Sequence, residues 1–322
     1  MTSRHTLEGL LVDPIEGVSP GRVTWEGAGI VSVERLEDGP AEPLVFPGFI
    51  DLQMYEPAAV AGQGVTGYLL AARSVQEVPD PLCLGLHLEG PFLNPEAAGA
   101  IPVEELTPVD LTALEEWLAS GLVRLVTLAP ELPRGLAAIH LVAGMGVVAA
   151  IGHTRANALT TLAALNAGAR FATHLWNAMS PVRARSTGPV PTLLLDRRAV
   201  LGLIADGRHL HPRTEELTVR VAGPERIALT SDLVAAPGHR SDGSLLGGDR
   251  CGAALVARMA RFGLAEAAAM ASLVPARLLG LRDRGRIASG YRSDLAVLGA
   301  RFAPLRTIVG GNIVWSVGYP DS

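Results

Sequence analysis

Short apolar segments that alternate with helical patterns constrain the fold of this chain more than any other feature. The segments are rich in Val, Leu, Ile and Ala, as expected of strands that are buried on both faces. They are Leu44–Leu52, Val65–Leu70, Leu82–Leu88, Val123–Leu128, Val147–Ile151, Phe171–Leu175, Val200–Ala205 and Arg226–Thr230. Eight such strands separated by helices favour an α/β fold whose parallel sheet closes as a (β/α)8 barrel. A doubly wound open sheet is the alternative, but no GxGxxG motif follows any of these segments.

Helical patterns fill most of the connections between these segments. They cover Asp110–Ser120, Arg134–Ala143, Ala156–Ala167, Pro212–Val221, Gly252–Phe262 and Leu264–Leu279. The connections after the first two strands, Met54–Gln63 and Ser74–Asp80, are too short to hold full helices. We therefore predict a TIM-like barrel in which one or two outer helices are trimmed on that side.

Both ends of the chain have a different character. Residues 6–46 and 286–317 contain short apolar runs that are broken by turn signals. Such patterns are typical of β-hairpins. We predict that the two ends pair into one small β domain of residues 1–46 and 282–322, beside a barrel domain of residues 47–281.

The composition excludes several functions. The net charge of −5 and the pI near 5.9 give no basic surface for nucleic acid or an anionic membrane. All 27 cationic side chains are arginine, which excludes lysine Schiff bases, P-loop lysines and lysine-derived metal bridges. Cys83 and Cys251 form no CxxC pair and indicate neither a zinc ribbon nor a disulfide framework. Met1–Val12 lacks the long apolar segment of a signal peptide, and we expect a cytoplasmic protein.

Polar side chains follow several of the predicted strands, at the end of a barrel where catalytic groups lie. Glu89, His153 and His174 stand at the ends of the third, fifth and sixth strands. Each of them alone is also compatible with a structural role. Together at one barrel mouth they predict a metal site, because two imidazoles and one carboxylate leave a position open for water. Such a metal lowers the pKa of its bound water from ~16 toward ~7.

Further polar residues follow the remaining strands. For hydrolysis of an amide at this metal site, Asp232 is predicted to be the general base toward water and then the general acid toward the leaving amine. The structural alternative for Asp232 is a helix cap or a turn residue. His209 is predicted to polarise the scissile carbonyl. His211 precedes a helix and is interpreted as structural. The guanidinium of Arg185 suits a phosphate or carboxylate, although chemistry alone favours a solvated loop arginine.

These motifs resemble those of the N-acetylglucosamine-6-phosphate deacetylases of the amidohydrolase superfamily. The resemblance runs from about Phe46 to the C-terminus, in the order found in the family. Its specific motifs are HLEGPF at 87–92 and ATHLxNAM at 172–179. The other matching stretches are Pro47–Gln53, Ile151–Thr154, Gly202–His209, Leu229–Asp232, Pro275–Leu281, Gly285–Ile287 and Ser293–Leu295.

The resemblance implies a barrel flanked by a small β-sandwich from both termini, and a homodimer. It implies that Glu89, His153 and His174 bind one divalent metal ion, with zinc expected first and iron second. It also implies that Asp232 is the catalytic acid and base and that His209 lies near the carbonyl.

For the substrate, the resemblance implies that Asn177 and Ala178 contact the sugar and that Arg185 contacts the phosphate. Gln53 matches a glutamine that stands beside the metal water in single-metal members of the superfamily. The implied reaction converts N-acetylglucosamine 6-phosphate to glucosamine 6-phosphate and acetate. The expected partner is therefore a small amino-sugar phosphate, with no nucleic acid and no membrane.

The chain also departs from the pattern of the family. Tyr55 replaces an asparagine of the single-metal members, and Ile101 replaces a histidine that recognises the phosphorylated substrate. The stretch between Asp51 and Pro81 is short. These departures favour two alternatives: a related amidohydrolase with a changed N-acyl or cyclic amide substrate, or a non-catalytic homologue that binds a sugar phosphate.

Overall fold

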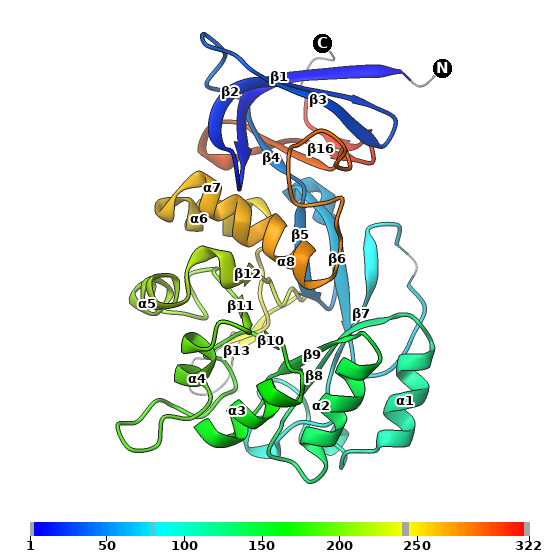
Figure 1. The fold of residues 1–322 in the computed structure, drawn as a ribbon, viewed down its shortest axis with the longest axis vertical. Helices are drawn as coiled ribbons and strands as arrows, with labels where there is room; N and C mark the ends of the chain where they lie inside the picture. The colour runs from blue at the N-terminus through cyan, green and yellow to red at the C-terminus, as the bar shows by residue number, and fades with distance from the viewer. Residues whose placement is uncertain (1–2, 79, 240–244, 319–322) are drawn as a thin grey trace. The chain divides into compact units, whose positions relative to one another are not determined.

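The structure is a computed structural model that describes residues 3–78, 80–239 and 245–318 (Figure 1). The chain divides into two compact units. The first combines Met1–Asp51, Pro57–Tyr68 and Arg250–Ser322, and the second combines Leu52–Glu56 and Leu69–Asp249. Across the described part of the chain, no helix reaches the length and apolarity needed to cross a membrane.

Strands from the two ends of the chain form one seven-stranded sheet in the first unit. In spatial order they are β17 (Asn312–Ser316), β16 (Pro304–Val309), β15 (Leu295–Leu298), β4 (Leu44–Pro47), β1 (Arg4–Asp13), β2 (Gly17–Glu26) and β3 (Gly29–Arg35). Ile30 and Ile308, from opposite ends of this order, share one buried core with Trp25. The sheet therefore folds over on itself, which confirms the small β domain predicted from both termini.

Segments beyond the predicted terminal domain also belong to the first unit. Helix α7 (Leu264–Ala268) contacts β1 and β2, and a 3-10 turn at Val60–Gln63 contacts β16 and β17. These contacts extend the first unit beyond residues 1–46 and 282–322. The domain boundaries drawn from the sequence stay a prediction.

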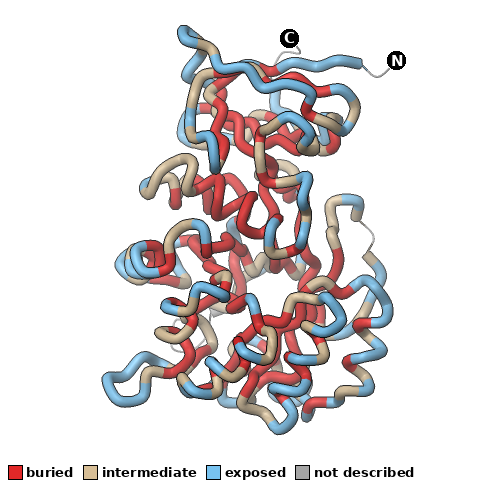
Figure 2. The backbone as a smooth tube through the Cα atoms, viewed as in Figure 1, coloured by how far each residue is buried: buried red, intermediate tan, exposed pale blue. Residues whose placement is uncertain are grey.

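The second sheet is the predicted barrel, and its eight strands lie in sequence order. They are β5 (Phe49–Met54), β6 (Val65–Ala72), β7 (Cys83–Glu89), β8 (Val123–Leu128), β9 (Val148–Ile151), β10 (Phe171–Ala172), β11 (Val200–Leu203) and β12 (Ile227–Leu229). A parallel bridge joins Met54 to Leu233, so the segment after β12 lies beside the end of β5. This contact nearly closes the sheet and confirms the barrel. Figure 2 shows that the barrel strands are largely buried, as expected of strands covered on both faces.

Helices follow most of the barrel strands. In the second unit they are α1 (Leu111–Ala119), α2 (Gly135–Gly144), α3 (Ala158–Ala167), α4 (Val190–Leu195) and α5 (Pro212–Ala222). Asp110, Asn157 and His211 accept hydrogen bonds from backbone amides in the first turns of α1, α3 and α5. Helix α4 was not predicted, because its six residues are too few to display a helical period.

The trimmed side of the barrel is confirmed. Among the described residues, the connection from β5 to β6 contains only the 3-10 turn, and the connection from β6 to β7 contains no helix. The first unit contributes the last helices, α6 (Ala253–Met259), α7 and α8 (Val274–Leu278). A π-helical turn at Ala269–Leu273 separates α7 from α8, so the continuous helix predicted at Leu264–Leu279 is interrupted. Pro275, at the start of α8, has no N–H for an α-helical hydrogen bond to the preceding turn.

The continuous strand predicted at Leu44–Leu52 is wrong, because Gly48 divides it into β4 and β5. Strand β4 pairs with β1 and β15, whereas β5 begins the barrel sheet. A Cβ atom added at Gly48 would lie 2.1 Å from the hydroxyl oxygen of Thr66. The backbone at this position therefore runs too close to Thr66 for a side chain, and glycine allows the approach.

Candidate active site

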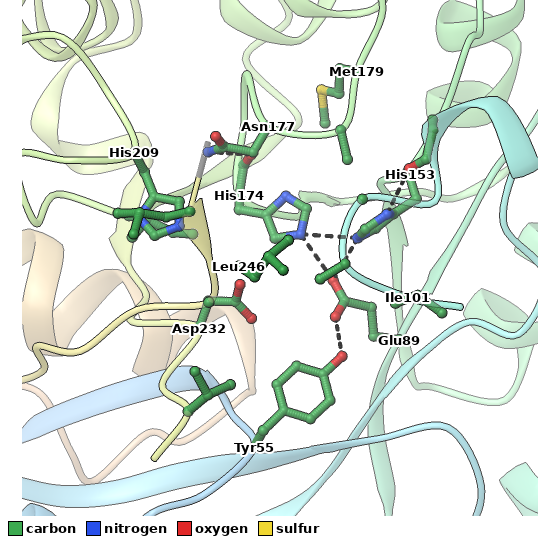
Figure 3. Close-up of a pocket in the computed structure, with 18 of the residues that line it drawn as sticks. Tyr55, Glu89, Ile101, His153, His174, Asn177, Met179, His209, Asp232 and Leu246 are labelled. Atoms are coloured by element: carbon green, nitrogen blue, oxygen red, sulfur yellow. Dashed lines mark hydrogen bonds and ion pairs between the residues drawn. The ribbon is translucent and has the colours of Figure 1, made fainter. Parts of the chain in front are cut away.

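A cavity of about 480 Å³ lies at the carboxyl ends of the barrel strands, within the second unit (Figure 3). Glu89 is the last residue of β7, and His153 and His174 each follow two residues after β9 and β10. Asp232 follows three residues after β12. All four side chains line the cavity, so the structure brings the predicted ligands and the predicted base together.

Glu89, His153 and His174 form a cluster with the chemistry of a metal site. The Nε2 atoms of the two histidines lie 3.1 Å and 2.9 Å from the same Glu89 oxygen, Oε1. All three side chains are buried, and their ligand atoms lie within 4.8 Å of one another. Two imidazoles and one carboxylate are a frequent donor set for a catalytic divalent cation. The donor set therefore fits the predicted metal.

The electrostatics of this cluster also suit a cation. Burial disfavours a charged His174, but the hydrogen bond and the charge of Glu89 outweigh it and raise the pKa of His174 to about 9. Burial likewise opposes the Glu89 carboxylate, yet the two histidines hold its pKa well below the ordinary value. The cluster thus stabilises positive charge between its nitrogens. A divalent cation would supply that charge in place of a proton.

The backbone is unusual at these residues. The φ angle is 47° at His153, 27° at His174 and 51° at Asp232, in the left-handed region that non-glycine residues rarely adopt. Such conformations cost about 1–3 kcal/mol each and persist where the surrounding structure enforces them. Here they occur two or three residues after barrel strands and accompany side chains that face one cavity. The strain is concentrated where the chemistry is predicted.

Gln53 connects the cluster to the predicted base. Its Nε2 donates to Glu89 Oε1 and to Asp232 Oδ1, at 2.9 Å in each case. Burial, followed by the negative charge of Glu89, raises the pKa of Asp232 to about 6. A carboxyl with this pKa can take up and release a proton near neutral pH. Gln53 is fully buried on β5 and holds the two carboxylates side by side.

His209 also lines the cavity and has a carboxylate partner that was not assigned from the sequence. Its Nδ1 lies 2.8 Å from Asp206 Oδ2, and Asp206 Oδ1 accepts the backbone N–H groups of Arg208 and His209. Although burial opposes its charge, the bonds from His209 hold the pKa of Asp206 at about 2. An aspartate three residues before a histidine, within a turn after a strand, is the signal that points to this pair.

The predicted substrate contacts divide into two groups. Asn177 and Ala178 follow His174 and line the cavity. Arg185 is exposed in the loop before α4 and is not part of the cavity lining. The structure therefore brings the two predicted sugar contacts to the cavity, but not Arg185 of the same chain.

Other cationic side chains line the cavity instead. Arg73 directly follows β6 and pairs with Glu105, and Arg155 donates from Nη2 to the Glu96 carbonyl at 2.8 Å. Neither arginine was assigned a role from the sequence. The position of Arg73 directly after a barrel strand is a signal that could have found it.

The two departures noted in the sequence also lie in this cavity. The Tyr55 hydroxyl donates to Glu89 Oε2. Burial, followed by the charges of Glu89 and Asp232, holds the pKa of Tyr55 well above its ordinary value. Ile101, which replaces a histidine of the resembled family, is 7% exposed and contributes an apolar wall to the cavity.

Residues 57–314 match the model of the amidohydrolase family. The chain belongs to the amidohydrolase family. It is 33% identical over 258 residues to an N-acetylglucosamine-6-phosphate deacetylase of Bacillus subtilis. The aligned region covers 72% of this chain and 65% of that protein. An N-acetylgalactosamine-6-phosphate deacetylase of Escherichia coli O157:H7 is 34% identical to this chain over 255 residues. That aligned region covers 71% of this chain and 67% of the relative.

Solved structures give the same relationship. This amidohydrolase superposes with a TM-score of 0.90 on a variant of the Mycobacterium smegmatis N-acetyl-D-glucosamine-6-phosphate deacetylase in complex with N-acetyl-D-glucosamine-6-phosphate. The identity is 27%, and the match covers 98% of this chain and 100% of that chain. In sequence, the match spans only 65% of the length of the Bacillus subtilis relative. The family match and the deacetylase relatives indicate a hydrolase of amide C–N bonds, as predicted from the sequence.

Proposed function

We propose that this chain is a metal-dependent deacetylase that hydrolyses N-acetylglucosamine 6-phosphate to glucosamine 6-phosphate and acetate. The observation that carries the proposal is the pair of hydrogen bonds from Gln53 to Glu89 and Asp232, at 2.9 Å each. They set a candidate base beside a candidate metal cluster within one cavity. The substrate is taken from the names of the similar deacetylases.

Glu89, His153 and His174 are proposed to hold one divalent cation, with zinc as the first candidate and iron as the second. A bound cation of this kind polarises an acyl carbonyl and makes a water molecule acidic enough to lose a proton near neutral pH. The Nδ1 of His153 lies 2.8 Å from the Ala97 carbonyl, which favours a proton on Nδ1 and leaves the lone pair on Nε2. This arrangement suits Nε2 of His153 as a ligand.

Asp232 moves the proton. Its carboxylate accepts a proton from water as the water oxygen bonds to the acyl carbon. It then gives the proton to the amide nitrogen as the C–N bond breaks, so the products are acetate and a free amine. A pKa raised to about 6 by burial lets one carboxyl serve both steps.

His209 stabilises the negative charge that develops on the acyl oxygen. Asp206 accepts a hydrogen bond from Nδ1 at 2.8 Å, so an imidazolium at His209 keeps its Nε2–H for the substrate. Loss of one donor of this kind typically lowers kcat about 10²–10³-fold.

The rest of the cavity recognises the substrate. Asn177 and Ala178 are proposed to contact the sugar, and Arg73 and Arg155 offer guanidinium groups to an anion such as phosphate. The phosphate contact of Arg185 stays a prediction. The cytoplasmic location expected from the sequence stays a prediction. The homodimer implied by the family resemblance stays a prediction, which light scattering of the purified protein tests.

The altered cavity wall favours a second candidate, a related amidohydrolase with a different amide substrate. Ile101 offers no hydrogen bond to a phosphate, and the Escherichia coli relative is named for an epimeric sugar phosphate. A panel of N-acetylgalactosamine 6-phosphate, unphosphorylated N-acetylglucosamine and cyclic amides tests this candidate. Faster turnover on any of them than on N-acetylglucosamine 6-phosphate favours it. Tight binding of the sugar phosphate without turnover favours a non-catalytic homologue.

The deciding experiment measures release of free amine from N-acetylglucosamine 6-phosphate, with added zinc and with a chelator. Turnover that the chelator abolishes and zinc restores supports metal, reaction and substrate together. Asp232→Asn is the matched control, because it removes the base and keeps the size of the side chain. Full activity in this variant, or no turnover by a zinc-loaded native protein, contradicts the proposal.

A further inference from the structure

Tyr55 makes a contact with the candidate metal site that the mechanism above does not use. Its hydroxyl donates to Glu89 Oε2, on the side of the carboxylate away from the histidines (Figure 3). The other oxygen, Oε1, faces Nε2 of His153 and Nε2 of His174 and also accepts from Gln53 Nε2 at 2.9 Å. The two oxygens of Glu89 therefore have different surroundings: one faces the proposed cation and the other accepts from a phenol.

This difference matters because a carboxylate can bind a cation through one oxygen or through both. A phenol is a hydrogen-bond donor at neutral pH. Its O–H occupies lone-pair density on Oε2 and sets the rotation of the carboxylate plane. Oε1 accepts from Gln53 as well, but it is the oxygen that faces both histidine nitrogens, so with Oε2 held by the phenol Glu89 presents Oε1 to a bound cation.

The backbone of Tyr55 is held by the closure of the barrel. Its backbone N–H donates to the Leu233 carbonyl at 2.9 Å, and the preceding residue, Met54, forms the parallel bridge to Leu233. Leu233 directly follows Asp232, so the phenol and the proposed base share one anchor. Groups on such a rigid frame keep their geometry better than groups on free loops.

We propose that Tyr55 is a positioning residue that holds Glu89 as a one-oxygen metal ligand and thereby keeps a coordination position open for the amide substrate. The inference rests on the metal site of the proposed function and adds the residue that sets its ligand number. In catalytic sites with three protein ligands, the remaining position belongs to water or substrate, so a second oxygen from Glu89 would compete for it.

The test compares Tyr55→Phe with the native protein, both loaded with cobalt(II). The visible absorption of cobalt(II) weakens when its coordination number rises, so the variant is expected to absorb less if Oε2 swings onto the ion. The same change should lower kcat about 10–100-fold, as is typical when an outer partner of a metal ligand is lost. Cobalt affinity, measured by chelator competition, should not fall. Tyr291→Phe, in the first unit, is the matched control and should leave the spectrum and kcat unchanged.

A second variant leaves Tyr55 in place. The Glu89→Gln side chain offers one oxygen donor only, so a ligand that already binds through one oxygen should give a cobalt spectrum of native intensity. Stronger absorption in this variant, or a native spectrum in Tyr55→Phe, overturns the inference and leaves the proposed function standing. A native protein that binds neither cobalt nor zinc overturns the metal-dependent function and this inference with it.

Discussion

The Nε2 atoms of His153 and His174 lie 3.2 Å apart, with their rings nearly perpendicular at 76°. At this separation the two nitrogens have no room for a hydrogen on each, so there is room for one hydrogen or one cation between them. A proton or a metal ion can fill that place. The carboxylate of Glu89, within 3.1 Å of both nitrogens, favours a divalent cation because it adds a negative charge to the pair.

Removal of divalent cations is therefore expected to destabilise the protein. A ligand present at 100 times its Kd adds about 2.7 kcal/mol to the free energy of unfolding, so Tm should fall when a chelator removes bound zinc. Scanning calorimetry of zinc-loaded and chelator-treated protein measures the shift. His153→Asn should abolish it, because the variant loses one ligand. Equal Tm values in the native protein, with and without zinc, would be evidence against a metal site.

Asp232 should give the reaction an acidic limb. The base works as a carboxylate, and burial raises its pKa to about 6. Activity should therefore decline as the pH falls through about 6, or through a lower value because a bound cation stabilises the carboxylate. The pH profile of kcat/KM measures this limb. A profile that stays flat down to pH 4 argues against Asp232 as the base.

Replacement of the same residue tests its role directly. Asp232→Asn should lower kcat about 10²–10⁴-fold, as is typical when a general acid or base is lost. Zinc content should stay at the native level, because Asp232 is not among the three clustered ligands. A variant that loses both zinc and activity would instead identify Asp232 as part of the metal site.

Variants of the cavity arginines should weaken recognition of the phosphate with little effect on catalysis. Arg73→Gln and Arg155→Gln remove guanidinium groups that line the cavity, so each should raise KM for N-acetylglucosamine 6-phosphate with little change in kcat. Arg185→Gln tests the contact predicted from the sequence. Steady-state kinetics with phosphorylated and unphosphorylated sugar measures all three. Variants that change KM equally for both sugars would show that these arginines do not bind the phosphate.

Much of the site could be predicted because its residues lie at the ends of barrel strands or within three residues of them. Glu89, His153, His174 and Asp232 stand at strand ends, and the carboxyl ends of parallel strands meet at one edge of a barrel. The fold was predictable for a related reason, since the strand at Val123–Leu128 has the same bounds in the sequence pattern and in the structure. A buried strand is visible as an apolar run between breakers.

Contacts between side chains from distant segments could not be predicted in the same way. Neither period nor composition indicates that the Tyr55 hydroxyl would reach Glu89, or that Arg185 would lie exposed outside the cavity. These depend on loop paths and rotamers. The missed break in the strand at Leu44–Leu52 has a similar origin, because it depends on the close approach of Thr66, which is distant in the sequence.

That break predicts a stability effect at residues that do not line the cavity. Gly48→Ala would place a Cβ 2.1 Å from the hydroxyl oxygen of Thr66, whose side chain is buried, so either the backbone or Thr66 must move. Overpacking of this kind costs about 1–3 kcal/mol, and urea unfolding measures it. Gly29→Ala is the matched control, because a Cβ there has no neighbour within 4 Å. Combining Gly48→Ala with Thr66→Ala should recover part of the loss, since the two side chains are in contact. Equal stability of Gly48→Ala and Gly29→Ala would contradict the role of this close approach.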